Sequence, residues 1–226
     1  MYDRSKPTIV NYGNMRRTKQ EAEQTRQALL DAAEVVFLER GVSQATLEAI
    51  ARAAGLTRGA IYWHFRDKTE LYAAMLERVR LPLERVLEEV RAQPNSDPIN
   101  VIEQMCLAAL DRVVQDAQLR RVYTIVLHRC ERDMGNPDWR DAELAGRRQA
   151  ARVFLDCFHE AARRGRLRPS LTPELAVAAL ESYFTGLVYV WLLEPQRIDL
   201  ATEAPELIRL FMRGFLNEDG DAAGGH

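Results

Sequence analysis

The sequence predicts an all-α protein of about nine helices, and three observations support that fold class. Apolar residues recur at helical spacing along most of the chain, and the alternation typical of strands is nearly absent. A capping side chain followed directly by proline, a pattern that favours helix starts, occurs at Asp97, Asn136 and Thr172. Finally, 47% hydrophobic and 28% charged residues are ordinary for a globular protein.

The first two helices are predicted from an apolar period and from residues that favour helix ends. Apolar residues at helical spacing indicate one helix over residues 20–40, which Gly41 ends as a C-terminal cap. Thr46 is a good N-cap for a short second helix, and Gly55 ends that helix. Two glycines and one threonine thus predict a long helix followed by a short one.

The next two helices come directly after. Thr57 caps a third helix that runs to about Trp63. Asp67 and Glu70 have the spacing of a capping box and predict a fourth helix that continues to about Arg91. The loops between these helices are therefore only a few residues long.

The later helices begin at the three proline-containing caps, Asp97–Pro98, Asn136–Pro137 and Thr172–Pro173. The run between Val101 and Arg132 is too long for one ordinary helix, and we divide it near Ala117. Gly165 ends the seventh helix and Glu194 ends the eighth, while the ninth spans about residues 202–217.

Four segments are predicted along the chain. Residues 1–14 differ in composition from the charged helix that begins after them, and they are either an extension before a functional start at Met15 or a mobile arm. Residues 15–66 form a helix-turn-helix domain, residues 67–217 form a second helical domain, and residues 218–226 form a disordered tail.

Charge and composition exclude several classes of protein. Residues 1–80 carry 13 Lys and Arg against 10 Asp and Glu, whereas the rest carry 18 against 23, so an anionic partner is expected at the front. The four histidines lack the paired spacing of metal ligands and no glycine-rich phosphate loop is present, so we expect neither an enzyme nor a metal or cofactor. Three scattered cysteines indicate reduced thiols in the cytoplasm. The longest apolar run has seven residues, whereas a membrane span needs about 20.

The stretch LTRGAIYWHF, residues 56–65, predicts the binding face of the second and third helices. Two short helices joined by a glycine-containing turn form a helix-turn-helix unit. If Ile61 points into the core, Gly59, Tyr62 and Trp63 turn outward, which suits a helix that enters a DNA major groove by its N-terminal end. A simple packing turn, with Trp63 in the core, fits the same spacing, so both interpretations remain open at this point.

The segment TLEAIARAAGLTRGAIYWHFRDKTELYAAML, residues 46–76, resembles the DNA-binding signature of TetR-family transcriptional repressors. The resemblance begins at Met15 and extends more weakly to about residue 200, and it is closest to the multidrug efflux repressors similar to AcrR and TtgR. It implies an arm along the duplex, phosphate or sugar contacts, and base contacts. The residues implied are Arg16, Arg17 and Lys19 for the arm, Thr46, Thr57, Tyr62, Trp63, His64 and Lys68 for the backbone, and Arg58 and Gly59 for the bases.

The same resemblance implies a ligand cavity among helices four to eight. The residues expected to line it are Met105, Cys106, Ala109, Tyr123, Leu127, Phe154, Glu181, Phe184, Thr185 and Val188. These side chains are mainly apolar and aromatic, as in most small-molecule sites. Glu181 is an acid within an apolar helix, so it would select a cationic ligand if buried, and the alternative is a position at the solvent edge.

A homodimer is expected through helices eight and nine. The eighth helix is apolar almost all round and must be covered on every side. The residues expected at the interface are Tyr183, Gly186, Val190, Leu207, Phe211 and Phe215. A two-fold dimer also suits DNA, because two recognition helices must lie about 34 Å apart. Without the resemblance, a monomer with a thick core remains an alternative.

These expectations combine into a ligand-responsive repressor that binds double-stranded operator DNA and is released by a hydrophobic small molecule. Ligand binding would shift the helix that begins after Asp67 and so change the spacing of the two recognition helices. Two alternatives remain: a regulator of the same type that controls a metabolic or signalling operon, and a helical ligand-binding protein that does not bind DNA.

Overall fold

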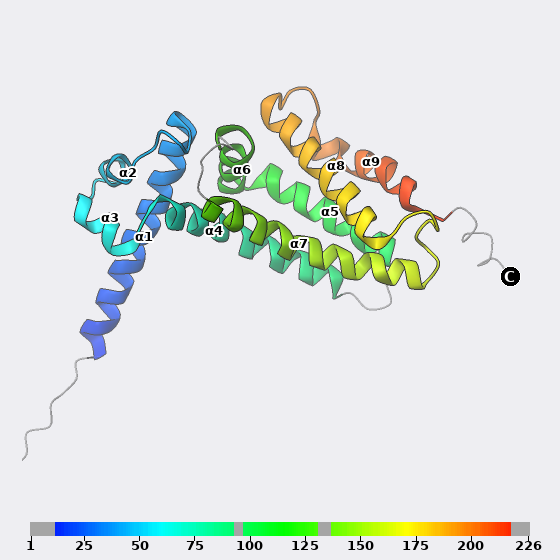
Figure 1. Cartoon of the computed structure of the whole chain (residues 1–226), viewed down its shortest axis with the longest axis horizontal. Helices are drawn as coiled ribbons and strands as arrows, with labels where there is room; N and C mark the ends of the chain where they lie inside the picture. The colour runs from blue at the N-terminus through cyan, green and yellow to red at the C-terminus, as the bar shows by residue number, and fades with distance from the viewer. Residues whose placement is uncertain (1–11, 93–96, 131–136, 218–226) are drawn as a thin grey trace, which may run out of the picture.

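The computed structural model describes residues 12–92, 97–130 and 137–217, and these ranges are helices joined by turns (Figure 1). The elements are α1 (Tyr12–Arg40), α2 (Leu47–Ala53), α3 (Arg58–His64), α4 (Lys68–Arg91), α5 (Pro98–Gln115), α6 (Ala117–Thr124), the π-helical turn η1 (Ile125–Arg129), α7 (Pro137–Arg163), α8 (Pro173–Leu193), α9 (Leu200–Met212) and the 3-10 turn η2 (Arg213–Phe215). The predicted all-α fold is confirmed. An isolated antiparallel bridge joins Leu167 to Leu216.

Local capping chemistry explains where the short helices begin and end. Thr46 accepts a hydrogen bond from the Ala49 amide at 3.1 Å, and Thr57 accepts one from the Ala60 amide at 3.3 Å. Each oxygen satisfies a backbone donor that the start of a helix leaves unpaired. Gly55 follows α2 with φ of 70°, the left-handed conformation that glycine adopts without strain. These predicted caps are therefore confirmed.

The capping box at the start of α4 differs from the prediction in one bond. Asp67 Oδ1 accepts from the Glu70 amide at 2.8 Å, as expected. Glu70 Oε2, however, accepts from the amide and the Nε of Arg66, at 2.8 and 3.0 Å, and not from the amide of Asp67. These bonds hold the pKa of Glu70 below its usual value. The reciprocal bond thus reaches one residue further back than in a standard box.

The predicted break between the fifth and sixth helices lies at Asp116. Its carboxylate accepts hydrogen bonds from the amides of Gln118 and Leu119, at 2.9 and 3.1 Å, and so begins α6. Arg112, one turn earlier on α5, pairs with the same carboxylate at 2.8 Å. One side chain therefore ends one helix and starts the next.

The terminal helices differ in extent from the prediction. α1 already begins at Tyr12, whereas the apolar period predicted a start near residue 20. α9 ends at Met212, and Arg213–Phe215 continues it as a 3-10 turn. Residues 1–11 and 218–226 of the predicted extension and tail, and the predicted cap Asn136, lie outside the described residues.

Two apolar cores lie at opposite ends of the molecule, and α4 runs from one to the other (Figure 1). The first core joins α1, α2 and α3 and takes Leu71 and Met75 from the start of α4. The second core joins α5, α7, α8 and α9 and takes Leu87 from the later part of α4. Val122 and Ile125, from α6 and η1, also pack into the first core. Both α4 and α6 thus contribute side chains to both cores.

The apolar composition of α8 has a structural explanation. Within the described residues, α8 is the one helix long and apolar enough to cross a membrane. One of its faces packs on α7 and contributes Leu180 and Val188 to the second core. Yet 33% of its most apolar stretch is buried within the chain, so another face remains uncovered. A helix that is apolar on all faces is stable in water only if other elements pack on all of them, and the described residues of this chain pack on part of its surface.

Candidate DNA interface and ligand cavity

α2 and α3 form a helix-turn-helix unit at one end of the molecule, joined through Gly55 (Figure 1). Ile61 is fully buried and Phe65 is 1% exposed, so both pack into the first core. Tyr62 is 44% exposed and Trp63 is 73% exposed. The outward aromatic face predicted for α3 is confirmed, and the alternative that placed Trp63 in the core is wrong.

Gly59 lies on the exposed face of α3, where the protein has room for a side chain. A Cβ added there would have Thr57 Oγ1 as its nearest neighbour, at 3.9 Å, which is an ordinary contact. Glycine costs a helix about 1 kcal/mol relative to alanine, so the fold alone favours alanine. The glycine thus leaves open space over the α3 backbone, into which another surface could approach closely.

Arg58 projects from the first residue of α3 and is held by two neighbours. Its Nε lies 3.2 Å from Glu48 Oε1 on α2, and its guanidinium carbon lies 5.6 Å from the centre of the Tyr62 ring. The Tyr62 hydroxyl donates to the same Glu48 oxygen at 3.3 Å. Because the ion pair uses Nε, the two terminal nitrogens can make the bidentate contact that arginine forms with guanine.

His64 lies at the end of α3, partly buried, with its ring against the edge of Trp63 at 4.5 Å between ring centres. Burial and the nearby charge of Arg26 lower the pKa of His64 from its usual value, and the charge of Glu23 opposes them. The surroundings of His64 in the free protein therefore favour the neutral imidazole. A phosphate placed beside it would favour the protonated form.

Lys68 is placed differently from the prediction of a phosphate contact. Its Nζ donates to the carbonyl oxygens of Val42, Ser43 and Ala45, at 2.7, 2.8 and 2.9 Å. An ammonium group has three protons, so these three bonds can occupy all of them. The prediction is corrected: Lys68 fixes the turn between α1 and α2 to the start of α4.

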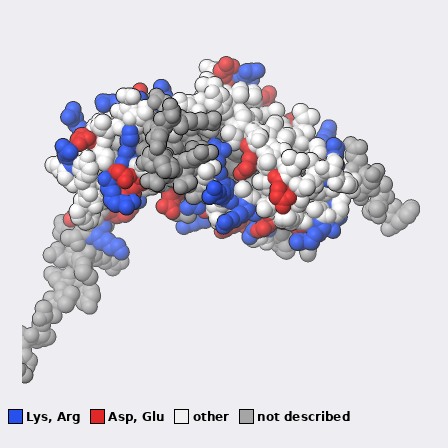
Figure 2. Space-filling view, in the orientation of Figure 1, with Lys and Arg blue, Asp and Glu red and all other residues white. Residues whose placement is uncertain are grey.

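The remaining predicted DNA contacts lie on the same end of the molecule. Lys19, near the start of α1, is exposed. The side chains of Arg16 and Arg17 lie outside the described residues, and their contacts remain a prediction. Thr46 and Thr57 are exposed at the two helix starts, and each capping hydroxyl keeps its own proton to donate. Figure 2 shows basic and acidic side chains mixed over the face in view, with no large field of one sign.

A cavity of about 580 Å³ lies among α4, α5, α6, α7 and α8. This volume is within the range of sites that hold drug-sized molecules. The wall is largely apolar and comes from five helices that are far apart in the sequence. Its larger apolar side chains include Leu76 and Leu87 of α4, Leu119 and Val126 of α6 and η1, Phe154 of α7, and Leu180 and Phe184 of α8.

Nine of the ten residues predicted for the ligand site line this cavity. They are Cys106, Ala109, Tyr123, Leu127, Phe154, Glu181, Phe184, Thr185 and Val188. Met105 does not line the cavity: on α5, Cys106 and Ala109 face the cavity, whereas Met105 packs within the second core. Whether the other nine contact a ligand remains a prediction.

The α4 wall carries a charged ladder that was not predicted from the sequence. Arg80 pairs with Glu84 at 2.6 Å and with Glu77 at 3.3 Å, and all three line the cavity. Their spacing of three and four residues was a readable sign that they share one helix face. Nothing in that spacing, however, shows whether the face looks at solvent or at a cavity.

A second polar group lies across the cavity on α6, α7 and α8. Burial raises the pKa of Glu181, and the positive charge of Arg147 opposes this rise. Burial also raises the pKa of Tyr123, again opposed by Arg147. Glu181 lines the cavity and is half-buried, with the cation of Arg147 near it. Cys106 shares the wall, and burial raises its pKa to about 12, so the thiol stays protonated.

One predicted interface residue is wrong, and three others have a role within the chain. Phe215 is 3% exposed and packs on Phe158 at 5.4 Å between ring centres, so a partner cannot reach it. The ring of Tyr183 stacks on Phe211 at 4.0 Å, and its hydroxyl donates to the Leu207 carbonyl at 3.0 Å. These contacts join α8 to α9 inside one subunit.

Other apolar residues of α8 and α9 point away from these contacts and are exposed among the described residues. On α8, Leu175 is 53%, Tyr189 is 41% and Leu193 is 57% exposed, and exposed Gly186 lies between them at helical spacing. On α9, Leu210 is 63% exposed. The Tyr189 ring also packs on His128 of η1, at 4.3 Å between ring centres, and stays partly exposed. Large exposed apolar side chains on two packed helices are typical of a contact site on a folded protein. We name these five residues of α8 and α9 the α8–α9 face.

An outward recognition helix, a drug-sized cavity and an uncovered apolar face together define a ligand-responsive DNA-binding regulator. Residues 29–75 match the family described as bacterial regulatory proteins, tetR family, and residues 97–216 match the C-terminal region of the MAATS-type transcriptional repressors. The chain therefore belongs to the TetR family of transcriptional regulators, which are not enzymes.

Individual relatives agree over most of their length. The transcriptional regulator TtgR of Pseudomonas putida is 37% identical over 193 residues, which cover 82% of this chain and 89% of TtgR. The crystal structure of NalD, the secondary repressor of the MexAB-OprM multidrug efflux pump in Pseudomonas aeruginosa, has a TM-score of 0.79 at 38% identity and covers 87% of this chain and 99% of NalD. SmeT of Stenotrophomonas maltophilia in complex with triclosan has a TM-score of 0.75 at 30% identity, over 87% of this chain and 94% of SmeT.

Proposed function

We propose that this chain is a cytoplasmic homodimeric repressor of a multidrug efflux pump operon, released from its operator by apolar small molecules. The observation that carries the proposal is that α4 links two features. It follows the exposed face of α3 at its start, and further along it forms part of the wall of a 580 Å³ apolar cavity. NalD and SmeT, two repressors of multidrug efflux pumps that are 38% and 30% identical to this chain, support the choice of target operon.

On the DNA side, we assign base recognition to the start of α3. Arg58 supplies a paired hydrogen-bond donor, and Gly59 lets the backbone approach the groove. Thr46, Thr57, Tyr62 and the other exposed groups around α3 position the helix on phosphates.

On the ligand side, the cavity favours a largely apolar molecule with one or two polar groups, because its walls are mainly apolar. The charged groups on the wall are three carboxylates and two guanidinium groups, those of Glu77, Glu84, Glu181, Arg80 and Arg147. The wall therefore has one carboxylate in excess, which accepts a neutral ligand and does not repel a cationic one. A hydroxyl group can bond to Tyr123 or Glu181 while the rest of the molecule fills the apolar space.

The α8–α9 face is the proposed subunit interface. It replaces the predicted Phe215, Leu207 and Phe211 with the outward residues of the same two helices, and it retains Gly186. A two-fold contact there pairs two recognition units on one DNA molecule.

The direct test is binding of the purified protein to the intergenic DNA upstream of its own gene, followed by fluorescence anisotropy. Triclosan, which occupies SmeT, serves as the apolar probe for release. Specific binding that triclosan or a similar neutral aromatic compound reverses is the expected result. A protein that binds no fragment of its home locus at low salt contradicts the proposal.

Arg58→Ala tests the assignment of base recognition within that assay. The substitution should weaken the free energy of operator binding by about 1–3 kcal/mol and relax the base preference at one position of each half-site. An equal loss on all sequences would make Arg58 a phosphate contact instead.

A further inference from the structure

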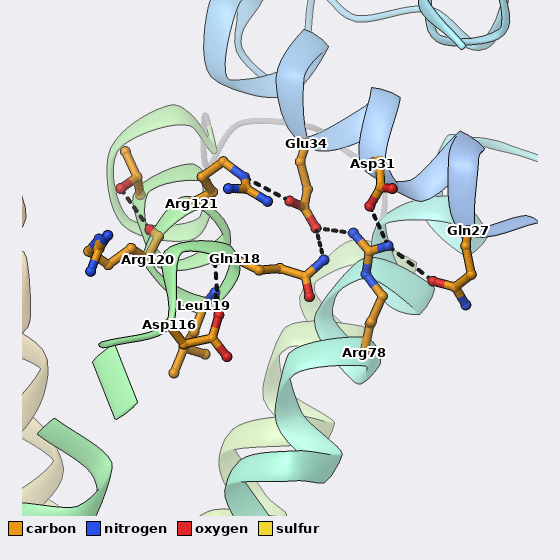
Figure 3. A network of polar contacts seen from close by, with 10 residues as sticks. Gln27, Asp31, Glu34, Arg78, Asp116, Gln118, Leu119, Arg120 and Arg121 are labelled. Atoms are coloured by element: carbon orange, nitrogen blue, oxygen red, sulfur yellow. Dashed lines mark hydrogen bonds and ion pairs between the residues drawn. The ribbon is translucent and has the colours of Figure 1, made fainter. Parts of the chain in front are cut away.

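Glu34, in α1, is the one charged side chain among the described residues that is fully buried, with 0% of its surface exposed. A buried carboxylate is costly unless charges and hydrogen bonds compensate it. Its partners come from two other helices: Arg78 of α4, and Gln118 and Arg121 of α6 (Figure 3). We name these four residues the Glu34 junction.

The carboxylate is shared unequally between the two helices. Oε1 accepts from Arg78 Nη2 and from Gln118 Nε2, the latter at 3.0 Å. Oε2 accepts from Arg121 Nε at 3.0 Å. One oxygen therefore bridges α4 and α6, and the other belongs to α6 alone.

Arg78 extends the junction along α1. Its Nη1 donates to Asp31 at 2.8 Å and to Gln27 at 3.1 Å, and its side chain is 14% exposed (Figure 3). Gln27, Asp31 and Glu34 follow one another by four and three residues, so they form one face of α1. This polar face of α1 is thus clamped by a single arginine of α4.

Both partner helices also line the ligand cavity. On α4, Glu77 and Val79 flank Arg78 in the sequence and line the cavity. On α6, Leu119 and Val122 each neighbour a junction residue and line it too. On both helices, residues of the junction are therefore direct sequence neighbours of residues of the cavity wall.

The α6–η1 segment has two further attachments to the first half of the protein. Val122 and Ile125 pack in the first core, while Leu119 packs in the second. The Val42 amide, just after α1, donates to the Arg129 carbonyl of η1 at 3.0 Å. α6 thus touches the cavity, the second core and α1 at once.

We infer that α6 transmits the state of the cavity to α1 through Glu34, as a second path beside the direct continuation of the recognition unit into α4. The inference rests on the proposed function and deepens its regulation. If α6 moves relative to α4, the two oxygens of Glu34 cannot keep all three partners. Because the loss of any partner leaves the buried carboxylate less well compensated, α1 is drawn along with the partners of Glu34, and the recognition unit moves with it.

A double-mutant cycle on operator affinity tests this path without requiring a known ligand. Ala150→Trp fills the cavity from α7, which contributes no residue to the junction. Arg121→Met removes the α6 ion pair but leaves Glu34 paired with Arg78, and Arg121 is 42% exposed, so no core residue is lost. The matched control is Arg91→Met, which breaks an exposed 3.0 Å ion pair between α4 and Asp156 of α7.

The operator affinity of each full-length variant is measured by anisotropy on the upstream DNA fragment. Ala150→Trp should weaken binding about tenfold in the wild-type and Arg91→Met backgrounds, and less than about threefold in the Arg121→Met background. Gln118→Met, a second variant on α6, should reduce the factor in the same direction. Light scattering and thermal melting show that each variant is folded and dimeric.

An equal loss in all backgrounds overturns the inference, since a structural ion pair would lower stability without changing the coupling. No effect of Ala150→Trp in the wild-type background overturns it as well, because the cavity then does not reach α1. Wild-type protein that fails to bind the fragment at all instead removes the proposed function. The two failures are therefore distinguishable.

Discussion

The recognition unit and the cavity wall are built in opposite ways. The α2–α3 unit is held by contacts between near neighbours in the sequence, such as the Thr46 and Thr57 caps and the Glu48–Arg58 pair. The cavity wall is assembled from five helices, α4 to α8, and side chains such as Tyr123, Phe154 and Glu181 come together there only through tertiary packing. A locally fixed unit keeps its shape when it moves, whereas a wall assembled from distant segments can rearrange when it is filled. The difference gives the protein a rigid DNA-binding element and an adaptable sensor.

The largest effect is expected at the α8–α9 face, on which both regions depend. Gly186→Glu should dissociate the dimer, because a carboxylate is placed in an apolar contact at a cost of about 3–5 kcal/mol. Within one subunit the change is harmless, since no atom lies within 4 Å of a Cβ at Gly186. Light scattering and operator affinity measure the result.

Gly214→Glu is the matched control for that change. A Cβ at Gly214 also has no neighbour within 4 Å, but the residue lies in η2, outside the proposed interface. It should leave both the dimer and operator binding intact. If Gly186→Glu remains dimeric with full affinity, the interface lies elsewhere.

Lys68→Met separates a structural role from a DNA contact. It removes three charged hydrogen bonds to the turn after α1, so the free energy of unfolding should fall by about 1–3 kcal/mol. The slope of log Kd against log salt should stay unchanged. Lys19→Met, at an exposed position of α1, should behave in the reverse manner and reduce the slope by about one. A reduced slope for Lys68→Met would restore the phosphate role.

Gly59→Ala sharpens the contrast between what the fold prefers and what DNA requires. Because the added Cβ meets nothing closer than 3.9 Å, the free energy of unfolding should rise by about 1 kcal/mol. Operator affinity should fall, since the methyl group meets the groove. A variant that gains stability and keeps full affinity would show that the groove does not approach this backbone.

The parts that could be predicted from the sequence are those with local causes. The caps at Thr46, Thr57 and Asp97 follow from side chains that bond to amides two or three residues away. Phe215 and Lys68 could not be placed in this way. A helical period shows which residues share a face, but not whether the face meets a partner or the core, and a lysine next to carbonyls looks the same in sequence as one next to phosphates.

The smallest effect is a pH dependence from His64. Burial and Arg26 lower its pKa from the usual value in the free protein, and a phosphate beside it in the complex would raise the pKa. Since the bound state then holds more protons, operator affinity should increase as the pH falls from about 8 to about 6, by less than about tenfold. His64→Gln should flatten the profile, and His159→Gln, on an exposed site of α7, should not. An unchanged profile in His64→Gln assigns the effect to another group.

The helix α8 serves two surfaces at once. Leu180, Phe184 and Val188 line the cavity, and Tyr189 and Leu193 are exposed on another face of the same helix. In the proposed dimer, α8 therefore belongs both to the ligand cavity of its own subunit and to the contact with the partner subunit. A ligand in the first cavity would shift α8 at the interface and so change the ligand affinity of the second cavity. Calorimetric titration should then show two unequal binding steps per dimer, whereas two identical, independent steps would mean that α8 does not couple the two cavities.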